Sequence, residues 1–357
     1  MKLPTPVKRY AFINAKLRAR LSKVLNKEFY ERLSSASSLN EAMILLKSTD
    51  FAPAAAVYEK TGDLKMSELE LFKAEVNLLK DLQSYCSKDV KEFIEALLCR
   101  YEIDSIKNAL RLWFDKQVRK RDVSYTSGYL FRETILNPVN IDALINAADL
   151  NALIQIFEKT PYMEIFQQKQ WYSGIETSVF QLENALDLFY YKQLLEAVKM
   201  LPDRDQQILK KIIGVQIDIE NIIRTVRFAD FYHLNSKDIV KYAIPGGMYI
   251  NLKSIEKAAS TGSIKDSLPI LMAKGYGKIF ALSGFDRASV SDRILIIEGI
   301  LNTILENEIR KMLTGYPFTI GIVISYFLIK RREAGRVMKI LNAVNYHLDP
   351  KTIKGKL

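Results

Sequence analysis

A sequence pattern that occurs twice, and more faintly a third time, sets the strongest limit on how this chain can fold. Residues 36–51 read ASSLNEAMILLKSTDF, and the same order of small, apolar and aromatic residues returns at 147–162, which is 111 residues further on. The faint copy lies at 261–276, a shift of 225 from the first. A unit that recurs in this way predicts similar structural units along the chain.

A second mark, Glu-x-x-Leu, begins at Glu68, Glu183 and Glu298, at a constant step of 115 residues. In the second copy it continues to Asp187 and to two tyrosines at 190–191. Because adjacent residues on a helix cannot both face one seam, one tyrosine is expected to pack and the other to line a surface or make a hydroxyl contact. Core packing is the favoured interpretation.

The third mark is an acidic box. Asp104 lies seven residues before Arg111, and 116 residues later Glu220 and Asn221 lie in the same arrangement before Arg227. Seven residues are about two helical turns, so acid and arginine lie on the same side of a helix. The pair could face a partner or bridge helices within the fold. The second interpretation is favoured, because repeated positions in repeated units usually serve the fold.

Apolar residues at intervals of three and four predict helices along the whole chain, and no strand pattern competes. The expected helices span residues 10–25, 28–37, 68–81, 90–116, 175–200, 204–231, 289–313 and 318–344, with Ser38 as a cap and Pro317 in the first turn of the last. The prediction is an all-α protein of three similar helical domains, at 1–120, 121–236 and 237–357.

Composition narrows the class further. The chain opens on Met1-Lys-Leu-Pro and a charged helix, which is not a secretory leader. Its longest nearly charge-free apolar run, 316–329, is shorter than the roughly 20 residues that span a bilayer. A cytoplasmic protein is expected, able to lie against a membrane. Cys86 and Cys99 are expected to be reduced and to pack as small hydrophobic residues.

The net charge of +11 suggests an acidic partner, an anionic lipid surface or a nucleic acid, although a solvated face explains most charge clusters. Nucleic-acid binding favours aromatic residues among basic ones. Trp113 and Phe114 before the basic cluster at 116–121 resemble this only faintly, and a helix end followed by a solvated linker is favoured.

The residues offer little for catalysis. His233 and His347 are the only histidines, and neither has cysteines or carboxylates at metal-binding spacing. Gly277-Lys278 lacks the upstream glycine of a phosphate-binding loop, and no Gly-x-Gly-x-x-Gly follows a strand. We therefore expect a non-catalytic protein without cofactor or metal.

An ordered set of segments resembles the C subunits of the V/A-type ATPases, a family that includes the d subunit of the eukaryotic vacuolar enzyme. The segments are YAFINAKLRAR at 10–20, YEIDSI at 101–106 with Arg111, LENALDLFYY at 182–191, IENI at 219–222 and PGG at 245–247. The resemblance covers nearly the full length. Departures are Ser105, where the family prefers Asn, and Arg336-Val337 after Glu333, where Asn-Leu or Asn-Ile is usual.

The resemblance implies three helical domains arranged as a funnel around a pseudo-threefold axis. Such a protein lies on the cytoplasmic face of the membrane, peripherally, between the proteolipid ring and a shaft made of the D and F subunits. It transmits torque for ATP-coupled proton or sodium transport and has no active site. Exposed partner contacts are predicted among Arg18, Arg20, Lys330, Arg331 and Arg332. The motif residues Asp104, Arg111, Glu183, Asp187, Glu220, Asn221 and Arg227 are predicted to be structural.

Two other classes stay open. An α-solenoid scaffold would stack its helices linearly and bind a peptide in a groove, and scattering would show an elongated particle. A basic nucleic-acid-binding protein would bind DNA or RNA with a steep dependence on salt.

Overall fold

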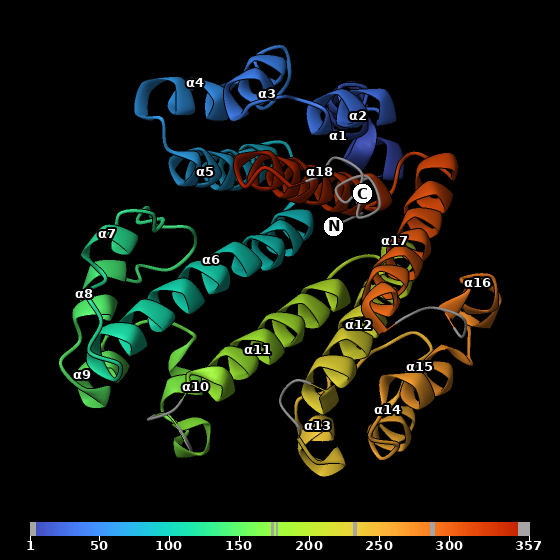
Figure 1. Ribbon diagram of the computed structural model, residues 1–357. Coiled ribbons are helices and arrows are strands. Elements are labelled where there is room, and N and C mark those ends of the chain that lie inside the picture. The colour runs from blue at the N-terminus through green and yellow to red at the C-terminus, as the bar shows by residue number, and fades with distance from the viewer. Residues whose placement is uncertain (1–4, 173–174, 176–177, 231–233, 286–289, 349–357) are drawn as a thin grey trace. The chain divides into compact units, whose positions relative to one another are not determined.

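The computed structural model describes residues 5–172, 175, 178–230, 234–285 and 290–348. All regular secondary structure in these residues is helical, which confirms the predicted all-α class (Figure 1). The chain forms two compact units: unit 1 is residues 1–197 and 326–357, and unit 2 is residues 198–325.

Unit 1 consists of an N-terminal series of helices joined by the C-terminal helix. Its helices are α1 (Pro6–Leu21), α2 (Lys27–Ser34), α3 (Leu39–Leu46), α4 (Ala52–Thr61), α5 (Leu64–Gln83), α6 (Lys88–Gln117), α7 (Ser124–Ser127), α8 (Ile141–Asn146), α9 (Leu150–Gln155), α10 (Met163–Phe166), most of α11 (Phe180–Lys199) and most of α18 (Gly321–Asn345), with a 3-10 turn at Lys169–Tyr172.

Unit 2 consists of two long helices and four short ones. They are α12 (Asp203–Asp230), α13 (Ser236–Lys241), α14 (Leu252–Ala259), α15 (Ile264–Met272), α16 (Gly277–Ala281) and α17 (Val290–Thr314). The long helix α12 packs against α13, α14, α15 and α17.

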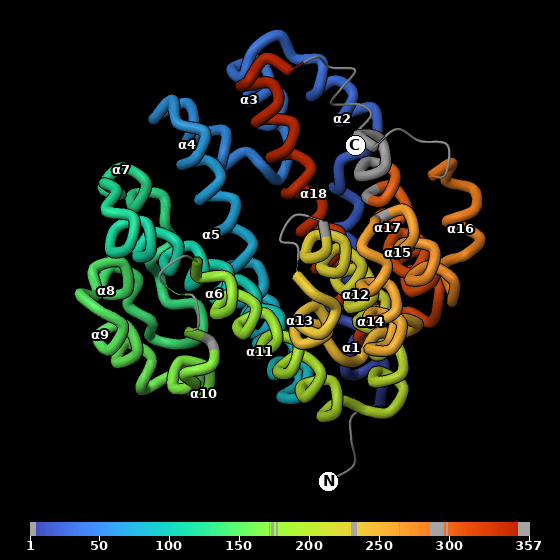
Figure 2. Tube along the Cα trace, turned by 60° about the horizontal axis from the view of Figure 1, so that its bottom comes forward, coloured from blue at the N-terminus to red at the C-terminus, as the bar shows by residue number. Residues whose placement is uncertain are grey.

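Within unit 1, the last helix packs against helices from the first part of the chain. Figures 1 and 2 both show α18 beside α5, with α3 and α4 nearby, although nearly the whole sequence separates α18 from α3. One apolar core joins them: Leu33 and Leu46 from the short helices are buried together with Val337, Ile340 and Leu341 from α18. The first copy of the recurring pattern therefore packs against the last helix.

The helices of the recurring pattern start in the same way. Ser38, Asp149 and Ser263 each accept a hydrogen bond from the backbone N–H three residues on, at the N-termini of α3, α9 and α15. Such caps satisfy a backbone donor that the helix itself leaves without a partner. The predicted cap at Ser38 is confirmed, and the other two stand at equivalent positions of the later copies.

Several predicted helix boundaries are wrong. The second helix ends at Ser34 instead of residue 37, and the helix expected from 175 begins at Phe180. Pro317 precedes α18, which begins at Gly321, because the chain just before it is held in a turn in which Asp205 accepts the Ile320 N–H at 3.0 Å. The ends predicted at 231 and 289, and His233, lie outside the described residues.

No helix in the described part of the chain combines the length and apolar character needed to cross a membrane.

Candidate functional site

Three carboxylates, each on a different long helix, are buried in the fold. Glu102 on α6 is 4% exposed, Asp218 on α12 is 0% exposed and Glu333 on α18 is 3% exposed. A buried charge is costly unless it is paired or hydrogen-bonded, so the partners of these groups show what they do.

Glu102 holds the loop that precedes α8. It accepts hydrogen bonds from the backbone N–H groups of Leu136 and Asn137, from the Asn137 side-chain amide and from the Tyr162 hydroxyl, all at 2.7 Å. Burial, aided by the neighbouring Cys99 and Glu102, raises the pKa of Tyr162 far above its usual value. The tyrosine therefore stays neutral and donates to the carboxylate.

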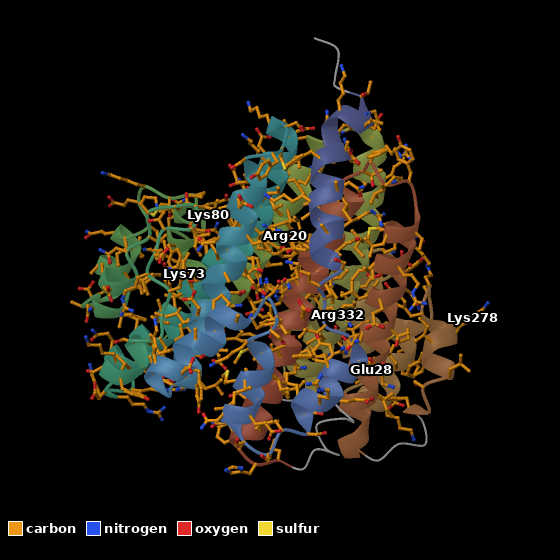
Figure 3. All side chains as sticks on the ribbon, turned by 90° about the horizontal axis from the view of Figure 1, so that it is seen from above. Arg20, Glu28, Lys73, Lys80, Lys278 and Arg332 are labelled. Carbon is orange, nitrogen blue, oxygen red and sulfur yellow. The ribbon has the colours of Figure 1, made fainter. Side chains whose placement is uncertain are left out.

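Two lysines of α5, labelled in Figure 3, reach the same loop from outside. Lys80 donates to the Thr134 carbonyl at 2.7 Å, and Lys73 pairs with Glu133 at 2.6 Å. Both pairs are solvent-exposed, so they contribute little compared with the buried anchor.

Asp218 anchors the loop before α14 in the same way as Glu102 anchors the loop before α8. It accepts the backbone N–H groups of Tyr249 and Ile250 at 2.8 and 3.0 Å and the Tyr276 hydroxyl at 2.7 Å. Burial raises the pKa of Asp218, and these hydrogen bonds oppose the rise.

The Pro-Gly-Gly sequence before this loop now has a physical reason. A Cβ on Gly247 would lie 2.3 Å from Asp218 Oδ1, closer than atoms can approach. Gly246 has a φ of 96°, which favours glycine because it has no Cβ. Both glycines therefore let the loop approach the carboxylate.

Glu333 holds the segment before α2, but a lysine takes the place of the tyrosine hydroxyl. It accepts the Leu25 N–H at 2.7 Å and a bond from Lys330 Nζ, which also donates to Asp50 at 3.2 Å. Phe51 occupies the place in the recurring pattern that Tyr162 and Tyr276 hold in the later copies, and it has no hydroxyl. Lys330 Nζ lies 5.4 Å from the centre of the Phe51 ring.

The sequence pattern did not single out Glu102 and Asp218. A signal was present, because residues 102, 218 and 333 are separated by 116 and 115 residues, the step of the other repeated marks. Glu102 and Asp218 also stand between large apolar residues. Glu333 was matched to the acid of the acidic box, whereas its contacts match those of Glu102 and Asp218.

The first acidic box and the Glu183 motif come together between α6 and α11. Arg111 pairs with Glu183 at 2.5 Å, while Asp187 accepts bonds from Lys107 at 2.9 Å and Arg100 at 3.1 Å. Arg111 and Asp187 thus contact charges on the neighbouring helix. The two tyrosines after Asp187 are both buried, which confirms the favoured interpretation of core packing.

Asp104 links α6 to the C-terminal helix. It pairs with Arg331 at 3.1 Å and with Arg100, on its own helix, at 3.3 Å. Arg331 also lies 5.3 Å from the ring of Tyr101.

In the second acidic box, the asparagine makes the hydrogen bonds. Asn221 is buried, donating to the Ile244 carbonyl at 2.9 Å and accepting the Ile244 N–H at 2.8 Å. Its side chain thereby fixes the turn that leads to the Asp218 loop. Glu220 is half-buried and Arg227 is exposed.

The predicted partner contacts differ in their exposure. Arg18 is exposed, and Arg20 is half-buried against Asp81 at 3.4 Å. Arg331 and Arg332 are partly buried. The side chain of Lys330 is only 13% exposed because it lies between Asp50 and Glu333, so it is not among the exposed residues of this set.

Reactive groups are few. Burial raises the pKa of Cys99 to about 12 and that of Cys86 to about 11, so both thiols stay neutral at physiological pH. Cys99 is buried, as expected, and Cys86 is half-buried. Among the described residues, no group of three or more His, Cys, Asp or Glu side chains could hold a metal ion. The clustered polar groups hold loops and helices together.

Comparison with known proteins gives a consistent family. A sequence profile described as ATP synthase (C/AC39) subunit matches residues 13–356. The C subunit of the A-type ATP synthase of Pyrococcus horikoshii is 23% identical over 351 residues, covering 97% of this chain and 89% of the relative. The corresponding C subunits of Methanocaldococcus jannaschii and Methanococcoides burtonii are 22% and 23% identical, covering 98% of this chain and 86% and 94% of theirs.

The profile match includes all three carboxylate-anchored loops, and the resemblance drawn from the ordered sequence segments is confirmed. The chain belongs to the ATP synthase (C/AC39) subunit family.

Proposed function

We propose that the chain is a non-catalytic subunit of an A/V-type ATP synthase that joins a rotating shaft to the membrane proteolipid ring and transmits torque between them. The family match across residues 13–356 carries the assignment to the complex. In this role the chain lies peripherally at the cytoplasmic face of the membrane. Its partners are the D and F subunits of the shaft and the proteolipid ring.

The anchored loops support a threefold plan. Glu102, Asp218 and Glu333 are buried on three long helices, and each accepts a backbone N–H from the loop that leads into a group of short helices. We infer from these contacts and their nearly constant spacing that the chain is built from three copies of one unit, with boundaries near residues 120 and 236. Three such units around an axis form the funnel that a shaft end requires.

The density of buried anchors suits a mechanical part. Torque passes through a protein only where its elements resist displacement, and a buried, fully hydrogen-bonded group holds its element more firmly than a surface ion pair does. The net charge of +11 complements acidic partner surfaces or the anionic leaflet. Arg18 is the exposed residue among the proposed contacts, and the side chains of Arg331 and Arg20 are 36% and 31% exposed.

A tagged copy of the chain, expressed in cells that lack their own, tests this function. Membranes solubilised in mild detergent are expected to yield the proteolipid and the large nucleotide-binding subunits together with the tagged chain. Cells without the chain are expected to hydrolyse ATP without pumping ions. Recovery of the chain alone from intact membranes would refute the assignment.

The contact surface is tested separately by Arg18→Glu. Charge reversal at an exposed residue leaves the fold intact and is expected to reduce recovery of the shaft or ring proteins. Arg32→Glu on α2, which is also exposed, is the charge-matched control. Equal recovery with both variants would remove Arg18 from the interface.

A further inference from the structure

A recess in unit 1 has two polar atoms among its lining residues that the contacts above do not satisfy. It has a volume of about 340 Å³, within the range of roughly 300–1,000 Å³ typical of small-molecule sites. Arg20 and Lys23 of α1, Leu71, Ala74, Glu75 and Leu78 of α5, Asp50 and Phe51 before α4, and Tyr326, Lys330 and Ala334 of α18 line it.

Two atoms at this recess have no hydrogen-bond partner. They are Nη1 of Arg20 and Oε1 of Glu75, and both are buried. Most buried polar atoms in native proteins have a partner, so two orphans beside one cavity call for a specific cause. Both side chains line the recess, and the last torsion of a carboxylate such as Glu75 rotates readily.

The charges around the recess favour an anion. Three cationic side chains line it, Arg20, Lys23 and Lys330, against the carboxylates of Asp50 and Glu75. Lys330 pairs with Asp50 at 3.2 Å and Arg20 pairs with Asp81 at 3.4 Å, so Lys23 supplies the remaining positive charge of the lining. The remaining wall is apolar or aromatic, which suits a short hydrocarbon stem.

The second carboxylate supports the same ligand. Burial raises the pKa of Glu75, while Arg331, the Tyr101 hydroxyl and Lys330 lower it and Asp104 raises it. When Glu75 is protonated it donates an O–H, and Glu75 and Arg20 then both offer donors to one acceptor. Two donors match the two oxygens of a carboxylate.

We propose that the recess between α1, α5 and α18 binds a carboxylate group on a short apolar stem, with Arg20 as its main anchor and Glu75 as the second donor. The ligand is either a free small acid or the acidic side chain of a partner segment. The recess lies at the one anchored loop where a phenylalanine stands instead of a tyrosine.

Titration calorimetry of the full-length chain with sodium butyrate tests the proposal. Butyrate is expected to bind saturably, and butyramide, which has the same shape without the charge, is not. Arg20→Gln is expected to weaken butyrate binding about tenfold or more, because a hydrogen bond to a charged group is lost. Arg32→Gln, which removes the same charge outside the recess, is expected to leave the affinity unchanged. Circular dichroism confirms that both variants fold.

The pH dependence of butyrate affinity tests whether Glu75 is a donor to the ligand. Butyrate affinity is expected to fall as pH rises through the raised pKa of Glu75, since only its neutral form donates. Glu75→Gln keeps a donor at every pH, so it is expected to bind butyrate with affinity that no longer falls over that range. An unchanged pH dependence in this variant would show that Glu75 is not the second donor.

A competition experiment between butyrate and a peptide identifies the source of the carboxylate. If an acetylated and amidated Ala-Glu-Ala peptide displaces butyrate, the natural ligand is a partner side chain; if it does not, the recess is reserved for a free acid. No saturable binding of butyrate, or equal binding by Arg20→Gln and the unmodified chain, would overturn the proposal and leave ordered water as the partner of the orphaned atoms.

Discussion

The Glu102 and Glu333 anchors perform the same task with different means. Glu102 receives four hydrogen bonds, three of them from one loop and one from a tyrosine hydroxyl. Glu333 receives one backbone bond and one from Lys330, whose positive charge replaces the hydroxyl. The difference shows that a buried carboxylate is what the fold retains at this position, while its partner can change from a neutral to a charged donor.

The largest expected effect comes from removing the better-bonded anchor. Glu102→Ala leaves four donors without their acceptor and is expected to lower the free energy of unfolding by about 4 kcal/mol or more. Glu333→Ala leaves only the Leu25 N–H without an acceptor, because Lys330 still pairs with Asp50. This change is expected to lower the free energy of unfolding by about 2 kcal/mol. Urea unfolding measures both. Equal losses would mean that the number of bonds does not set the strength of an anchor.

The charged partner is tested by Lys330→Met. This change leaves a buried Glu333 carboxylate with a single backbone donor and is expected to cost about 2–3 kcal/mol of unfolding free energy. Adding Phe51→Tyr in the same chain supplies the hydroxyl that the other two anchors use. Recovery of about 1 kcal/mol in the double variant would establish that the three anchors are interchangeable. A further loss would show that this copy has repacked too far to accept a tyrosine.

The two tyrosines allow the neutral anchors to be compared with each other. Tyr162→Phe and Tyr276→Phe each remove one hydroxyl without changing the ring, and each is expected to cost about 1 kcal/mol. Hydrogen exchange at residues 136–137 and 249–250 is expected to speed up only in the loop whose tyrosine was changed. Faster exchange in the other loop would contradict independent anchors.

The smallest expected effect is one of pH at Asp218. Its pKa is raised by burial, so the folded state binds a proton more readily than the unfolded state, and this group's contribution to stability falls as pH rises from its unfolded to its folded pKa. Over that range the unmodified chain is expected to lose a fraction of a kcal/mol relative to Asp218→Asn, measured by urea unfolding. The opposite slope would mean that the three hydrogen bonds outweigh desolvation.

Much of the helical architecture was predictable, because apolar periodicity and capping residues act locally. Helices α5, α6 and α12 lie within a few residues of their expected spans, and Ser38 caps α3 as its type and position indicate. The end of α18 was also close, whereas its start was displaced by the Asp205 contact, which joins residues 115 apart in sequence. Long-range contacts of this kind leave no local pattern.

The candidate site was predicted less well. The acidic box drew attention through repetition, yet its acid and arginine contact other helices, and the buried acids two residues earlier hold the loops. Lys330 belongs to a run of basic residues, which usually indicates an exposed surface. One of its partners, Asp50, is 280 residues away in sequence, and the other, Glu333, lies one helical turn further along α18. Exposure depends on which helices pack around a side chain, and charge in the sequence does not report it.

The sequence by itself determined the all-α class, the positions of most long helices, the recurring segments and the family, because each of these depends on order and spacing along the chain. Only the tertiary structure decided that the first recurring segment packs against the last helix, and that Glu102, Asp218 and Glu333 are the groups that anchor the loops. The physical reason is that burial of a charge is set by elements that are distant in sequence, and its cost is met by donors that only the fold brings within reach.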